Sequence, residues 1–119
     1  MIHFNERELP MAAYPVNLNQ LVTGKAYYQI TYDGDDKDME APLVLSMVFI
    51  GMNIDDDETD TVYFQDALSY DFGIRLSDDP ESGTFMLFRC TPDGLGAIFE
   101  FDQALDELMK CSIRRQRGK

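Results

Sequence analysis

Acidic side chains gathered in three short segments are the residues whose types and spacing could do chemistry in this chain. The first segment, 33–40, holds five acidic residues and Lys37. The second and third contain Asp55, Asp56, Asp57, Glu58, Asp60, Asp78, Asp79 and Glu81. Clustered carboxylates attract cationic surfaces, pair well with Arg and can also coordinate hard divalent cations. The sequence therefore offers two chemistries, binding of a basic partner and binding of a cation.

The cation hypothesis depends on residues 55–66, which superficially follow a calcium-binding loop. Side chains that carry oxygen stand at its first, third and fifth positions, and an acid stands at its twelfth. However, the sixth position is Asp60 where a sharp turn requires Gly, and the twelfth is Asp66, which is shorter than the usual bidentate Glu. We expect no specific metal site and keep divalent-cation binding by the acidic loops as an alternative.

Nucleophilic catalysis would need a thiol or hydroxyl beside a base. Cys90 and Cys111 are the candidate thiols, and His3 is the only imidazole in the chain. Both cysteines fall where a strand or helix packs, which is the usual place of a free, buried Cys. The acidic clusters lie in segments open to water, where we see nothing that would raise a carboxyl pKa for acid–base work. We expect no catalytic residue, no cofactor and no enzyme, with a ligand or enzymatic pocket between helix and sheet as the alternative.

The charge balance narrows the class of partner. The chain has 119 residues, 22 acidic and 10 basic, for a formal net charge of −12. A field of this sign repels phosphate backbones and anionic lipid headgroups, so nucleic acid and membrane are disfavoured as partners. The first residues lack a signal-peptide pattern, and the longest apolar run, 43–52, is about half of what a membrane helix needs. We expect a cytoplasmic protein with a basic protein partner, and its oligomeric state stays open.

Strands are predicted through the middle of the chain. Alternating or continuous apolar residues indicate six of them, over residues 26–32, 43–50, 61–65, 72–76, 84–90 and 97–101. Residues 91–94 carry Pro and Gly at turn positions, so the last two strands should form a hairpin with Phe99 and Phe101 inward.

A change of period at Asp102 predicts a helix over residues 102–116. Asp102 can cap this helix, and its apolar stripe should hold Leu105, Leu108 and Met109. One domain follows, 1–119, with an irregular lead-in over 1–25, a β-rich body over 26–101 and this helix. Strands at short spacing before a closing helix predict a mainly β (α+β) fold, a small, strongly bent antiparallel sheet or partly open barrel of about five to six strands.

Three segments resemble the SH3-like small barrels in their layout. They are GKAYY at 24–28, the apolar strand that ends in FIG at 49–51, and VYFQ at 62–65. The resemblance implies a partly open SH3-like barrel, and it carries no catalytic motif.

Consecutive loops of an antiparallel meander emerge at opposite ends of the sheet. The loops that contain 55–60 and 78–81 should therefore emerge together and form one acidic rim. The segment 33–40 should lie at the far end, beside Asp66 and Asp71.

Two tyrosines are predicted to accompany the acidic residues on the surface. The alternation that turns Tyr28 and Ile30 inward turns Tyr27 outward, and with Phe64 inward Tyr63 also points outward. Tyrosine beside charge is typical of a binding face. Cross-strand pairing that stiffens the sheet would equally explain these residues.

These observations together predict a non-catalytic, acidic protein-interaction module that binds a basic protein partner. An inhibitor or immunity-type protein that masks a cationic toxin or nuclease would fit this description. The predicted binding residues are the acidic residues of 55–60 and 78–81 together with Tyr27 and Tyr63. Solvated loops that serve solubility alone would explain the same acidic runs. The basic residues near the C-terminus match the dipole of the predicted helix, and they could also reach an acidic loop of the same chain or of another copy.

Overall fold

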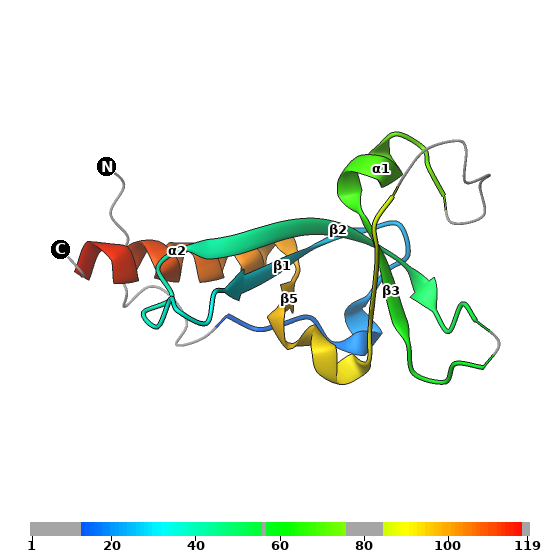
Figure 1. The fold of residues 1–119 in the computed structure, drawn as a ribbon, viewed down its shortest axis with the longest axis horizontal. Coiled ribbons are helices and arrows are strands. Elements are labelled where there is room, and N and C mark those ends of the chain that lie inside the picture. Colours follow the sequence, from blue (N-terminus) through cyan, green and yellow to red (C-terminus); the bar gives the residue numbers. More distant parts are fainter. Residues whose placement is uncertain (1–12, 56, 76–84, 118–119) are drawn as a thin grey trace.

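The computed structural model describes residues 13–55, 57–75 and 85–117 (Figure 1). Its strands are β1 (Ala26–Tyr32), β2 (Pro42–Met52), β3 (Val62–Asp66), β4 (Leu87–Cys90) and β5 (Ile98–Phe99). Its helices are α1 (Ala67–Asp71) and α2 (Phe101–Arg117), with the 3-10 helices η2 (Leu18–Gln20) and η4 (Pro92–Ala97). The predicted α+β class, antiparallel sheet and C-terminal helix are confirmed.

The five strands form one open antiparallel sheet in the order β4-β3-β2-β1-β5. β2 is the long central strand, and its two halves have different neighbours. Its first half pairs with β1, with Pro42 opposite Tyr32, and its second half pairs with β3, with Met52 opposite Val62. The register shifts beside Gly51, whose φ of 141° is a conformation that residues with a Cβ rarely adopt. The strands do not close into a barrel, so β4 and β5 remain as edges.

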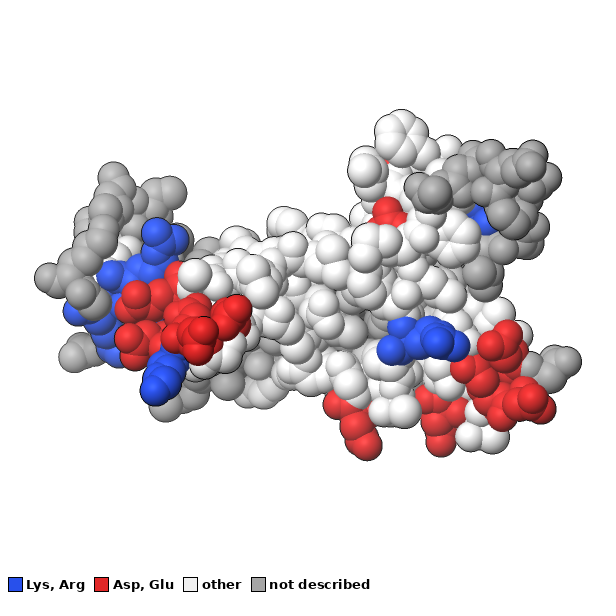
Figure 2. Space-filling model, in the orientation of Figure 1, with Lys and Arg blue, Asp and Glu red and all other residues white. Residues whose placement is uncertain are grey.

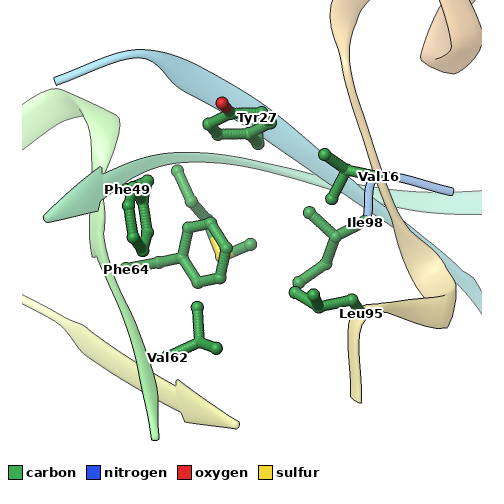
Figure 3. Close-up of a cluster of buried hydrophobic side chains, with 8 residues drawn as sticks. Val16, Tyr27, Phe49, Val62, Phe64, Leu95 and Ile98 are labelled. Carbon is green, nitrogen blue, oxygen red and sulfur yellow. The ribbon is translucent and has the colours of Figure 1, made fainter. Parts of the chain in front are cut away.

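One face of the sheet buries the larger hydrophobic cluster, which Figure 3 shows. Phe64 lies at its centre, with its ring centroid 6.2 Å from that of Tyr27 and 5.8 Å from that of Phe49. Val16 from the N-terminal segment and Leu95 from η4 close the cluster. Burial of side chains of this size stabilises the fold by about 1.5–3 kcal/mol each, so this cluster is the main support of the sheet.

The other face of the sheet carries α2, which packs over β1 and β5. Ile30, Phe99 and Ala104 form a second cluster there, and Leu108 packs against it. The helix covers 101–117 and so confirms the predicted helix over 102–116. Its buried residues are Ala104, Cys111 and Ile113, while Leu105 is 43% exposed. The predicted apolar stripe is therefore confirmed at Leu108 and wrong at Leu105, because Ala104 and Cys111 rather than Leu105 turn toward the rest of the protein.

The predicted hairpin of 84–90 with 97–101 is wrong. β4 and β5 lie on opposite edges of the sheet, and β5 pairs with β1. The turn beginning at Pro92 continues as η4, which carries the chain across the sheet and away from β4. Phe99 is buried as expected, but Phe101 begins α2 and is 62% exposed.

The predicted strand over 72–76 is also wrong for its described residues, 72–75. The chain forms α1 just before them, because the Asp66 side chain accepts the backbone N–H of Ser69 at 2.9 Å and caps a helical turn. Phe72 then ends this helix with its side chain exposed.

Candidate functional site

Hydrogen bonds tie together the described residues of the second acidic segment, which connects β2 to β3. Asn53 has a φ of 52°, and its side chain ties the two ends of the loop together. Its Nδ2 donates to the Thr59 carbonyl at 3.0 Å, and its Oδ1 accepts the Thr61 N–H at 2.8 Å. Glu58 accepts the Asp55 N–H at 3.0 Å within the same loop. We call residues 53–61 the acidic tip.

Glu58 is turned toward the protein, unlike the other described acids of the acidic tip. The Tyr63 hydroxyl donates to its carboxylate, and this hydrogen bond holds the pKa of Glu58 below its usual range. The positive charge of Arg89, which lies opposite Tyr63 on β4, lowers the same pKa further. The tip therefore presents its remaining described carboxylates, Asp55, Asp57 and Asp60, to solvent. The predicted site residues Asp56, Asp78, Asp79 and Glu81 lie outside the described residues.

The two tyrosines expected on the surface are buried, which corrects the prediction of an aromatic ridge. Tyr27 is 0% exposed and Tyr63 is 2% exposed. The Tyr27 hydroxyl accepts the N–H of Val22 at 2.8 Å and donates to the carbonyl of Gln20 at 3.1 Å. The sheet buries side chains on both of its faces around these two residues, so alternation along β1 and β3 does not separate inward from outward positions. Tyr27 thus supports the core, and Tyr63 orients Glu58 from within.

The first acidic segment lies at the opposite end of β2 from the acidic tip, as expected. It does not lie beside Asp66 or Asp71, because β3 is short and pairs only with the second half of β2. Asp66 stands opposite Met47, whereas the segment enters β2 at Pro42, about 17 Å along the strand. The acidic groups at the left of Figure 2 intermingle with basic groups of the same chain.

Arg114 of α2 is the main link between the helix and this first segment. Its Nε donates to the Met39 carbonyl at 2.8 Å, and its Nη2 donates to the Tyr32 hydroxyl at 2.9 Å and to Glu107 at 3.1 Å. Burial and the hydrogen bond to Glu107 raise the pKa of Tyr32, which keeps its hydroxyl protonated. The basic end of the helix therefore folds back on an acidic segment of the same chain. Helix-dipole complementarity alone does not account for it.

The cysteines lie among packing residues. Burial raises the pKa of the Cys90 thiol and of the Cys111 thiol. The Cys111 thiol donates to the Glu40 carbonyl at 3.2 Å, which adds a second contact between α2 and the first acidic segment. A raised thiol pKa favours the protonated, less nucleophilic form of each cysteine. His3, the expected base, lies outside the described residues.

Two cavities in the described part of the chain lie elsewhere than the expected place under the C-terminal helix. One, of about 270 Å³, lies between α1 and the start of β4 and is lined by apolar side chains that include Leu68 and Phe72. The other, of about 260 Å³, lies between β4, η4 and the core face of the sheet. Met47, Phe64 and Ile98 contribute to its wall. Either is smaller than the usual pocket for a small molecule.

Among residues 13–55, 57–75 and 85–117, no three His, Cys, Asp or Glu side chains converge in a way that could hold a metal ion. The same ranges contain no helix long and apolar enough to cross a membrane. Comparison of the chain with known protein families, curated proteins and solved structures finds no match.

Sequence reasoning found the acidic tip but missed two residues that shape it. Asn53 had a signal, since Asn tolerates a positive φ and often ties a turn. Arg89 had none, because its position near Glu58 follows from the pairing of β4 with β3.

Proposed function

We propose that this chain is a non-catalytic protein-interaction module that binds a basic protein partner through the acidic tip. The observation that supports the proposal is the internal hydrogen bonding of the tip, which joins its described residues and leaves three described carboxylates facing solvent. A preordered loop loses little conformational entropy on binding, so more of the interaction energy appears as affinity.

The two ends of the sheet differ in how far their acidic charge is compensated. At the end that carries 33–40, Arg114 donates a hydrogen bond to the Met39 carbonyl, and Lys37 belongs to the segment itself. At the acidic tip, Arg89 is the nearby cation, and its charge acts on the inward-turned Glu58. Asp55, Asp57 and Asp60 are exposed to an external cation. Asp33, Asp35 and Asp38 are exposed as well, but basic groups of the same chain lie among the acidic groups at that end (Figure 2), so we place the proposed site at the tip.

Electrostatic attraction from such a loop acts mainly on the rate of encounter and on partner choice. Exposed ion pairs are worth about 0–1 kcal/mol each, and salt screens them over about 8 Å at physiological ionic strength. We therefore expect the association rate to fall as salt rises. Additional contacts would have to supply most of the affinity.

The experiment compares two triple variants that each remove three negative charges. Asp55→Asn, Asp57→Asn and Asp60→Asn neutralise the acidic tip, and Asp33→Asn, Asp35→Asn and Asp38→Asn neutralise the first segment as a matched control. Each variant and the parent chain are used as bait in a pull-down from the native host, with partners identified by mass spectrometry. We expect the tip variant to lose basic proteins that the parent and the control retain. Recovery of the same proteins by all three would refute the proposal.

The finer form of the proposal is an inhibitor or immunity-type protein that covers the cationic surface of a toxin or nuclease. The same finer proposal includes the SH3-like, partly open barrel expected from the sequence. A basic partner recovered in the pull-down would be assayed for loss of its own activity when the parent chain is added. Unchanged partner activity would leave a binding module and rule out an inhibitor.

A further inference from the structure

β4 is an edge strand, and within the described part of the chain its outer backbone groups have no backbone partner. Just before it, the Asp66 N–H of β3 donates to the Met86 carbonyl at 3.1 Å. Residues that face the same neighbour alternate along an antiparallel strand, so Phe88 and Cys90 also face β3. The N–H and C=O groups of Leu87 and Arg89 therefore face away from β3, where the described residues provide no backbone partner.

The cavity of about 260 Å³ borders this free edge. Leu87 and Arg89 line it although their side chains belong to the opposite face of the sheet, so it is their backbone that borders the cavity. Met47, Phe64 and Ile98 form an apolar wall, and each is nearly fully buried in the core cluster. A groove with exposed strand backbone on one side and an apolar wall on the other fits an extended peptide better than a compact ligand.

The charge around the edge indicates which peptide would bind. The last residue of β4, Cys90, stands opposite Val62, which follows the acidic tip directly. Asp93, exposed on η4, lies just beyond the same end of the strand. Figure 2 shows the resulting row of acidic groups along the lower right of the molecule, where Figure 1 places the connection of β2 to β3 and η4. Arg89 does not reverse this field, because its charge lies near Glu58.

We propose that the edge of β4 binds an extended segment of the basic partner, which adds a sixth strand to the five-stranded sheet. The backbone of this segment pairs with Leu87 and Arg89, one of its aliphatic side chains enters the cavity, and its flanking Lys or Arg residues meet the acidic tip. This inference rests on the proposed function and adds the way in which the partner is held.

The probe is a synthetic peptide with blocked ends, Lys-Lys-Thr-Val-Thr-Val-Thr-Lys-Lys, titrated into the ¹⁵N-labelled chain. We expect the peptide to add antiparallel to β4. Its two valines then turn their side chains toward the cavity and their N–H groups away from β4, so the threonines form the hydrogen bonds with β4. We expect submillimolar binding, with amide shifts at Leu87, Arg89 and Gln29, another residue of the cavity wall. N-methylation of two threonines should weaken binding at least about tenfold, since two interstrand hydrogen bonds are lost. N-methylation of the two valines should leave it nearly unchanged.

A matched pair of protein variants tests the same edge from the other side. Leu87→Pro removes the outward N–H at the first position of β4, where an edge strand tolerates proline, and Leu87→Ala removes the same side chain but keeps the N–H. We expect Leu87→Pro to weaken peptide binding about tenfold relative to Leu87→Ala. Because the methylated peptides use the unaltered chain, a misfolded proline variant would not obscure the result.

The outcomes separate this inference from the function on which it rests. Peptide shifts confined to the acidic tip, or equal binding of both methylated peptides, would overturn strand addition and leave the acidic-tip function standing. Edge binding whose Kd and salt dependence are both unchanged in the Asp55, Asp57 and Asp60 triple variant would overturn the role of charge, and with it the proposed function. No binding at millimolar peptide would overturn strand addition. A dimer whose Leu87 and Arg89 amides are already protected would show that a second copy occupies the edge, which also overturns it.

Discussion

Replacement of Arg114 by alanine should separate the C-terminal part of α2 from the first acidic segment. The guanidinium donates to three acceptors from different parts of the chain, the Met39 carbonyl, the Tyr32 hydroxyl and the Glu107 carboxylate. It also lies 5.5 Å from the centre of the Tyr32 ring. Alanine removes all of these contacts at once.

The expected cost follows from the number and exposure of these contacts. A hydrogen bond contributes about 0.5–1.5 kcal/mol net, so three of them would sum to about 1.5–4.5 kcal/mol. The Arg114 and Glu107 side chains are 25% and 17% exposed, so water replaces part of what is lost. We expect Arg114→Ala to lower the free energy of unfolding by about 2–3 kcal/mol. Arg114→Lys should lose about half as much, because lysine keeps the charge but lacks the planar fork.

The assay is urea unfolding followed by far-ultraviolet circular dichroism, with the slope against urea checked for constancy. The matched control is Arg115→Ala, which removes the same charge from the exposed neighbouring position and should stay within about 0.5 kcal/mol of the parent chain. If Arg114→Ala and Arg115→Ala unfold with the same free energy, the helix is held by its apolar face alone. The contacts of Arg114 would then contribute nothing measurable to stability.

Three further outcomes are expected. Gly94→Ala should destabilise the chain by about 1–3 kcal/mol in thermal or urea unfolding, because the new Cβ would lie 2.8 Å from the Cβ of Cys90. Gly96→Ala is the control, since its Cβ would meet nothing within 4 Å and the change should be neutral. Equal effects of the two substitutions would refute this packing. Tyr63→Phe should raise the pKa of Glu58 toward 4.5 in an NMR titration. The stability that the lowered pKa provides exists above pH 4.5 and is lost as pH falls through that lowered value, so the parent and Tyr63→Phe should converge in acid, and a constant difference would contradict the link. Tyr27 and Tyr63 should resist nitration in the native chain and react in urea; modification at the native rate of an exposed tyrosine would show that they are not buried.

The sequence predicted the elements whose pattern is local. The strands expected over 26–32, 43–50 and 61–65 correspond to β1, β2 and β3 within one or two residues, and the expected helix corresponds to α2. Apolar periodicity acts over a few neighbouring positions, so one chain is enough to find it. Asp102, the expected cap, lies instead in the first turn of α2, which begins one residue earlier at Phe101. β5 is shorter than the expected strand over 97–101. It holds only two paired residues, because η4 ends just before it and α2 begins soon after it.

The candidate site was predictable only in part. The acidic residues of 55–60 were found directly in the sequence. Their position at the opposite end of β2 from 33–40 followed from the rule that consecutive loops of an antiparallel sheet emerge at opposite ends. The outward direction of Tyr27 and Tyr63 was wrong, because both faces of these strands are covered. The inward turn of Glu58 depends on Tyr63 and Arg89, which no spacing rule connects.

The chain's amino-acid order by itself determined its charge, its main strands and its closing helix, since these depend on residue type and on spacing along a few positions. The tertiary structure alone decided that Arg114 lies against the first acidic segment, that Glu58 turns toward Tyr63, and which tyrosines are buried. It also decided that β4 ends the sheet beside a cavity, with outer backbone groups that have no backbone partner among the described residues. Those properties depend on contacts between residues that lie far apart in the chain. Such contacts are set by strand pairing and side-chain packing, which exist only once the whole sheet has formed.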